Sequence, residues 1–118
     1  MKLVRMLVLA AVAVASIAAF AAPASADVAG CQDQIGALRG LTESTATFTN
    51  PTRDQASLVA KLDAASAKLE DGKVDDAILK LTDFRGRVTQ LAATGKVGAA
   101  DGAALIAGAD AAITCLTE

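Results

Sequence analysis

The sequence of 118 residues contains no histidine, tryptophan or tyrosine, and only three phenylalanines. Without histidine the chain lacks the usual general base of hydrolases and the commonest protein ligand of transition metals. Proteins that hold single-stranded nucleic acid stack bases on aromatic side chains, which are almost missing here. These absences argue against nucleic-acid binding, haem ligation and histidine-dependent catalysis.

The first 26 residues have the pattern of a secretory signal peptide. Lys2 and Arg5 form a positively charged start, residues 6–20 are almost entirely apolar, and Ala24-Ser25-Ala26 offers the small residues that signal peptidase requires. The apolar stretch is too short for a convincing membrane anchor. We therefore expect a cleaved signal peptide and a single exported domain over residues 27–118, located outside the cell or in its envelope, with no stable membrane span.

The mature chain is small and acidic. The signal peptide takes two of the eleven basic residues and none of the thirteen acidic ones, which leaves a net charge of −4. Such a surface is a poor starting point for binding nucleic-acid phosphates. A domain of this size has a modest core, so a covalent cross-link would add useful stability.

Apolar residues recur at helical spacing in four segments, and no segment alternates with the period of a strand. Small residues, among them Gly102 and Gly108, predict close packing of the last segment. We expect an all-α, small antiparallel three-to-four-helix bundle with short connections. The expected helices run from about 28 to 41, from Pro51 or Thr52 to Gly72, from Asp75 as N-cap to Gly95, and from Gly98 or Ala99 to about 116.

The two cysteines fall in the first turn of the first helix and the last turn of the fourth. An up-down-up-down bundle places these two turns at the same end, so Cys31 and Cys115 are predicted to form a disulfide in an oxidising compartment. The alternative is a lipoprotein, because Val28-Ala29-Gly30-Cys31 matches the pattern that precedes an acylated cysteine. Pro23 and Asp27, which separate this pattern from the apolar stretch, argue against lipidation.

Glu70, Asp71, Asp75 and Asp76 crowd the turn between the second and third helices. Carboxylates of this kind could bind calcium, but their spacing does not fit an EF-hand loop. Capping and solvation of the helix ends account for all four. We therefore predict no metal site and no cofactor.

Neither serines nor arginines give a clear catalytic pattern. Ser57 with Lys61, or Ser66 with Lys73, could form a Ser–Lys pair, but such pairs are common on helical surfaces and nothing marks an oxyanion hole. The arginines are interspersed with acidic residues, which favours an ordinary solvated face over an anion site. The arginines concerned are Arg39, Arg53, Arg85 and Arg87.

Residues 56–116 combine a Leu/Ala helix, a glycine turn, a helix with Leu81, Phe84 and Val88 at its centre, and an Ala-rich closing helix. In this arrangement the segment resembles the FIMAH-type module, a small helical unit of exported bacterial proteins. Gly98 and the sequence Arg85-Gly86-Arg87 depart from the pattern of that family. The resemblance implies an interaction module without catalytic residues, here extended by an added first helix.

We thus predict a secreted, non-enzymatic helical module that binds another secreted or envelope protein. The alternative is a carrier of a small apolar ligand in the bundle core, suggested by the Ala-rich last helix. Three apolar residues lie outside the helical stripes and are candidates for the interface: Phe48, Leu79 and Val97. For Phe48 a second role is open, as a lid over the end of the core.

Overall fold

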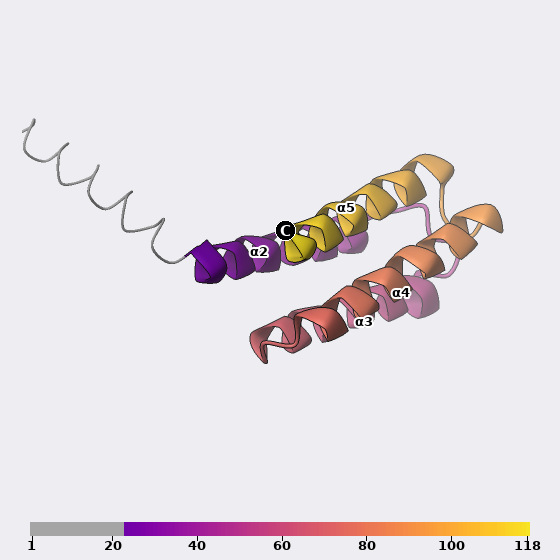
Figure 1. The fold of residues 1–118 in the computed structure, drawn as a ribbon. Coiled ribbons are helices and arrows are strands. Elements are labelled where there is room, and N and C mark those ends of the chain that lie inside the picture. Colours follow the sequence, from indigo (N-terminus) through magenta and orange to yellow (C-terminus); the bar gives the residue numbers. More distant parts are fainter. Residues whose placement is uncertain (1–22) are drawn as a thin grey trace, which may run out of the picture.

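The computed structural model describes residues 23–118, with side chains from residue 28 onward, so most of the predicted signal peptide lies outside the described residues. This range forms four α-helices and one π-helical turn, and contains no strand. The expected all-α bundle is confirmed (Figure 1). Its elements are α2 (Pro23–Ser44), η1 (Pro51–Gln55), α3 (Ala56–Glu70), α4 (Val74–Ala93) and α5 (Ala99–Thr117).

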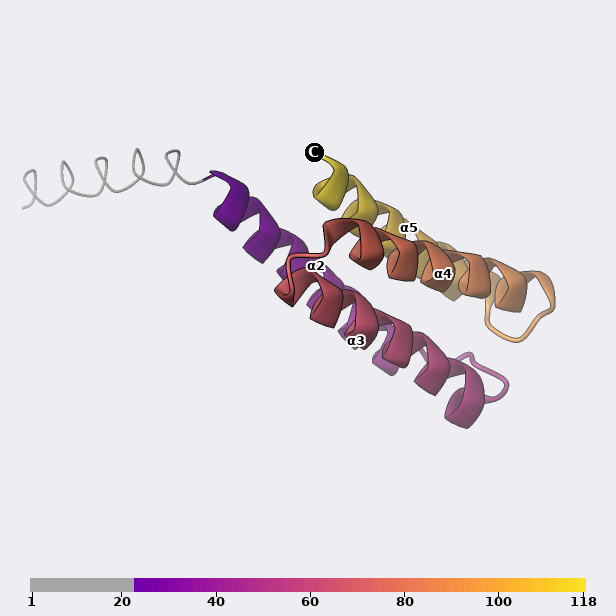
Figure 2. The ribbon, with the colours of Figure 1, turned by 60° about the horizontal axis from the view of Figure 1, so that its bottom comes forward.

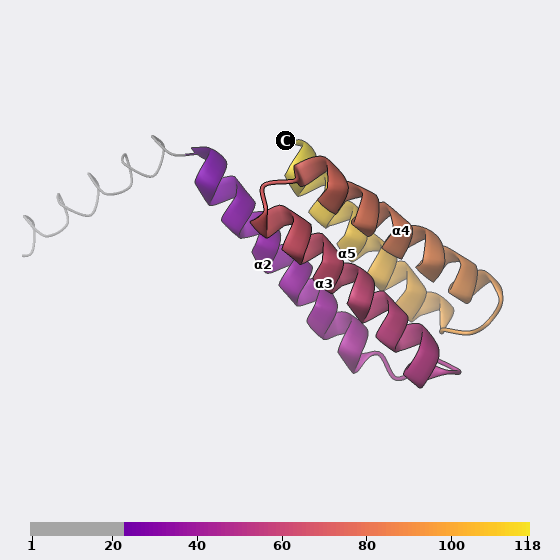
Figure 3. The same cartoon turned by 90° about the horizontal axis from the view of Figure 1, so that it is seen from below.

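The helices form an antiparallel ring in which each helix packs against its neighbours in the chain. The last helix, α5, returns to pack against α2 and closes the ring. The α2–α3 and α4–α5 connections lie at one end of the bundle (Figure 2). The short α3–α4 turn and the C-terminus lie at the opposite end (Figure 3).

The core consists of the apolar stripes of the four helices. On α2 the buried residues are Cys31, Ile35 and Leu38, followed by Thr42, whose hydroxyl donates to the Leu38 carbonyl over 2.8 Å. Leu41 is exposed, because residue 42 lies closer than residue 41 to the line set by residues 31, 35 and 38 on a 3.6-residue helix. The other fully buried large apolar side chains are Leu58, Leu62, Leu81, Phe84, Val88, Leu91 and Leu105.

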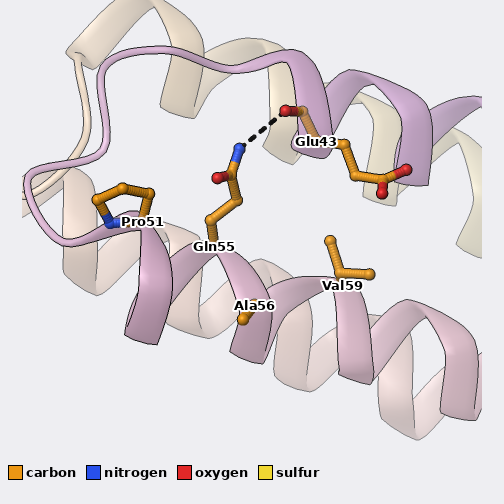
Figure 4. Close-up of a pocket in the computed structure, with 5 residues that line it drawn as sticks. All are labelled: Glu43, Pro51, Gln55, Ala56 and Val59. Carbon is orange, nitrogen blue, oxygen red and sulfur yellow. Dashed lines mark hydrogen bonds between the residues drawn. The ribbon is translucent and has the colours of Figure 1, made fainter.

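The C-terminal end of α2 is capped by a side chain from the next element. The Gln55 Nε2 group donates to the carbonyl oxygens of Thr42, Glu43 and Thr45, at 2.7, 3.0 and 3.1 Å. The carbonyl groups in the last turn of a helix have no N–H donor within the helix, and the Gln55 amide supplies the missing donors. The bond to Glu43 is drawn in Figure 4. This cap stabilises the last turn of α2, which ends at Ser44, three residues after the predicted end at residue 41.

Two Gly-Lys-Val sequences form matching turns. Gly72 and Gly95 have φ angles of 76° and 73°, a left-handed conformation that glycine adopts without strain. The backbone N–H of the following lysine donates to the carbonyl five residues earlier in both cases, at 2.9 Å for Lys73 and 2.8 Å for Lys96. The helices themselves end two residues before these glycines, at Glu70 and Ala93, so the predicted ends at Gly72 and Gly95 are each two residues late. The predicted cap at Asp75 is wrong, because α4 already begins at Val74 and Asp75 lies inside its first turn.

Glycines in α5 allow close contact with both neighbouring helices. A methyl group added at Gly108 would lie 2.7 Å from Leu38 Cδ1 of α2. At Gly102 the same group would lie 3.0 Å from the Ala92 side chain of α4. An ion pair of 2.8 Å between Arg85 and Asp110 joins α4 and α5 outside the core. The expected close packing of the Ala-rich helix is therefore present at these two positions.

By length and composition alone, α5 could cross a membrane. It has 19 residues, and the mean hydropathy of its most apolar window is 1.4. In the bundle its Leu105, Ala109 and Ala112 face the core. Core helices and membrane spans share this composition, and here the apolar stripe is covered by neighbouring helices.

Candidate functional site

The disulfide between Cys31 and Cys115 is present, as the topology of the bundle predicted. It joins α2 to α5 across 84 positions of the sequence, with the two Cα atoms 5.7 Å apart. Cys31 is buried in the core. Lipidation would consume the same Cys31 sulfur, so the disulfide and the lipoprotein alternative are mutually exclusive.

Two of the three candidate interface residues are buried. Phe48 is 7% exposed and Val97 is 2% exposed, and both belong to the hydrophobic core. Their connections are joined by a 2.9 Å hydrogen bond from the Thr49 N–H to the Lys96 carbonyl. Because this bond draws both connections over the end of the bundle, the interface assignment of Phe48 and Val97 is corrected to a core role. This is the lid alternative for Phe48.

The third candidate, Leu79, is on the surface. Its side chain is 61% exposed, more than that of any other large apolar residue in residues 28–118. It lies in an open depression of about 330 Å³ between α3 and α4. Two lysines and two aspartates complete the lining: Lys68, Lys80, Asp76 and Asp83.

A second depression, of about 360 Å³, lies between the end of α2 and the start of α3 (Figure 4). Its lining includes Glu43, Pro51, Gln55 and Val59. The Gln55 amide points across it to the end of α2, where its N–H groups are engaged as a cap. The main polar donor of this depression therefore serves the fold.

A third depression, of about 340 Å³, is lined by cationic side chains. Arg53 comes from η1, Arg87 from α4 and Lys96 from the turn after α4, with Gln90, Leu91 and Thr94 between them. The sequence predicts these arginines on a solvated face. The fold instead brings Arg53 and Arg87, which are 34 positions apart, to one buried carboxylate.

That carboxylate belongs to Asp54, which has no exposed surface. Its Oδ1 accepts hydrogen bonds from Arg53 Nε and Arg87 Nη2, both at 3.2 Å. Its Oδ2 is buried and has no hydrogen-bond partner within the described part of the chain. The hydrogen bond from Arg53 holds the pKa of the Asp54 carboxyl below its usual range, although burial acts in the opposite direction, and the charges of both arginines add to the lowering. Sequence inspection missed this group because nothing in a helix start marks an aspartate as buried.

Asp54 should make stability depend on pH. A carboxyl whose pKa is lower in the folded state stabilises the fold above its unfolded value, about 3.9, and this contribution is lost as the pH falls through the folded value. We expect Asp54→Asn to lower the melting temperature most at pH 7 and progressively less below about pH 4. Thermal unfolding at several pH values measures this difference. Asp33→Asn, at an exposed position, is the control and should follow the wild type; an Asp54→Asn deficit that stays constant with pH would contradict the assignment.

Two of the other groups considered from the sequence are the carboxylate cluster and Ser66. Within residues 28–118 no three histidine, cysteine or acidic side chains come together where they could hold a metal ion. The Ser66 hydroxyl donates to Gln32 Oε1 at 2.7 Å, and Gln32 Nε2 donates to the Ser66 carbonyl at 3.0 Å. Ser66 thus joins α3 to α2 instead of contacting a lysine.

Comparisons with protein-family models, with curated proteins and with solved structures find no match to this chain.

Proposed function

We propose that the mature chain is an exported, non-catalytic helical module that docks onto another exported or envelope protein through the surface around Leu79. The observation that carries the proposal is the exposure of this leucine. Fifteen positions of the four helices bury an apolar or disulfide-bonded cysteine side chain, whereas Leu79 leaves 61% of its surface in solvent. Folding of the bundle does not require an apolar residue there.

The surroundings of Leu79 fit a small protein interface. Protein interfaces place an apolar anchor at the centre and polar side chains at the rim. Here the rim carries two positive and two negative side chains, so its formal charge is zero. A rim whose positive and negative charges balance favours a partner with mixed polar groups over a strongly charged polymer. The resemblance of residues 56–116 to FIMAH-type modules supports the same kind of function.

The observed packing gives no support to the alternative, a carrier of an apolar ligand. Such a carrier needs space between the helices at the centre of the bundle. The central positions are filled by the fully buried side chains of Leu62, Leu81, Phe84 and Leu105. The depressions described above are open to solvent and lie on the surface of the bundle, and each has polar or charged side chains in its lining.

The proposal is tested by placing a photo-crosslinking residue at position 79 or at position 41 and expressing each variant in a cell that exports the chain. Leu41 is the matched control because it is also an exposed leucine on a helix. We expect one defined protein crosslink from position 79 and none from position 41. With that partner purified, Leu79→Ala should weaken binding about 10-fold, and Leu41→Ala less than about 2-fold.

Both alanine variants should unfold within about 0.5 kcal/mol of the wild type, because neither side chain is in the core. Equal crosslinking from both positions, or unchanged binding by Leu79→Ala, would contradict a role of Leu79 as the anchor.

A further inference from the structure

The cationic depression carries a local charge opposite to that of the whole chain. Arg53, Arg87 and Lys96 contribute three positive charges to its lining, and Asp54 beneath them contributes one negative charge. A surplus of two positive charges therefore remains. Salt screens exposed charges over about 8 Å at physiological ionic strength, so the charges of the lining act on a bound ligand more strongly than the distant charges that give the net −4.

The depression also has unused hydrogen-bond donors. Arg53 uses only Nε, toward Asp54, and within the described residues its two terminal nitrogens and the Lys96 ammonium make no hydrogen bond or ion pair. Arg87 is more constrained, because Nη2 contacts Asp54 and Nη1 donates to Gln90 at 2.9 Å. Arg53 and Lys96 are thus the side chains that can bind a ligand without giving up a contact of the fold.

Asp54 holds the two arginine side chains of the depression in position before a ligand binds. One oxygen of this buried carboxylate holds both arginines, and both arginines line the same depression. The hydrogen bond between Thr49 and the Lys96 carbonyl fixes the backbone that carries the third cation. A site whose cations are already positioned loses less conformational entropy when it binds an anion.

We propose that this depression binds a phosphoryl oxyanion, with Arg53 and Lys96 as the direct ligands and Arg87 as the cation at its base. Guanidinium groups match the oxygens of phosphate with paired hydrogen bonds, and lysine adds a point charge. A surplus of two positive charges suits a phosphate monoester or free phosphate better than a single carboxylate. The same phosphomonoester group is present in the headgroup of phosphatidic acid. The site is separate from the Leu79 surface, so either proposal can fail alone.

The test uses nuclear magnetic resonance of the oxidised mature protein titrated with inorganic phosphate, and with acetate at equal ionic strength. We expect saturable shifts of the Arg53 side-chain Nε–H and the Lys96 amide with phosphate, and much weaker shifts with acetate. The double variant R53Q/K96Q should bind phosphate about 10-fold more weakly. The matched control K61Q/K73Q removes two lysine charges elsewhere and should stay within about 2-fold of the wild type.

Vesicles distinguish the two sources of the phosphoryl group. Sedimentation with phosphatidic acid vesicles, but not with phosphatidylcholine vesicles, that is lost in R53Q/K96Q and kept in K61Q/K73Q would identify the lipid headgroup. Phosphate shifts without vesicle binding would identify a soluble phosphate. The proposal is overturned if the wild type responds to neither probe, or if the two double variants lose binding equally. Circular dichroism of both variants establishes that the helices are intact.

Discussion

Replacing both cysteines, as Cys31→Ala/Cys115→Ala, should lower the free energy of unfolding by about 4.5 kcal/mol in the chain-entropy account of cross-links. The bond joins residues 84 positions apart, so it closes a loop that contains nearly the whole domain. A loop of that length removes many conformations from the unfolded chain. Because small domains have only a few kcal/mol to lose, we expect the variant to be partly unfolded at 37 °C.

Denaturation in guanidinium chloride, followed by circular dichroism, measures this loss. The reduced wild-type protein is the control, since it keeps both side chains but opens the loop. It should unfold within about 1 kcal/mol of the double variant if loop closure is the main contribution. Equal stability of the oxidised wild type and the double variant would contradict the importance of the cross-link.

Phe48→Ala should lower the free energy of unfolding by about 3 kcal/mol, the second largest effect that we expect. Phe48 is the buried aromatic residue of a connection, and it covers the core at the end opposite the disulfide. Its removal would leave a cavity in the hydrophobic core to which Phe48 belongs. Denaturant unfolding of the oxidised protein measures the loss.

Phe48→Leu is the matched control, because it keeps an apolar side chain and should cost less than about 1.5 kcal/mol. An alanine variant that unfolds like the wild type but no longer binds a partner would restore Phe48 as an interface anchor.

Most of the fold could be predicted because helical periodicity records which face of each helix is buried. The spacing of Leu81, Phe84 and Val88 places the three side chains on one face of a helix. The first glycine of each Gly-Lys-Val sequence has a positive φ angle and marks the turn that follows a helix. The length of α2 could not be predicted in this way. It depends on a cap from Gln55, which is in contact with the end of α2 only after the two helices have packed.

The candidate sites were predictable to different degrees for the same reason. Pairing of Cys31 with Cys115 followed from helix direction alone, and the exposure of Leu79 followed from its place outside a stripe. Phe48 lies in a connection without periodicity, so its burial required the tertiary structure. The contact of Arg53 and Arg87 through Asp54 likewise joins two elements whose relative position no local pattern encodes.

We propose an exported bundle in which a disulfide joins α2 to α5. The intact mass of the unreduced protein, purified from a cell that exports it, tests this proposal most directly. We predict a chain that begins at Asp27, carries no added group, and gains the mass of two hydrogens on reduction. Peptide mapping should place the bond between Cys31 and Cys115. A chain that begins at an acylated Cys31, or two free thiols in the unreduced protein, would contradict the account.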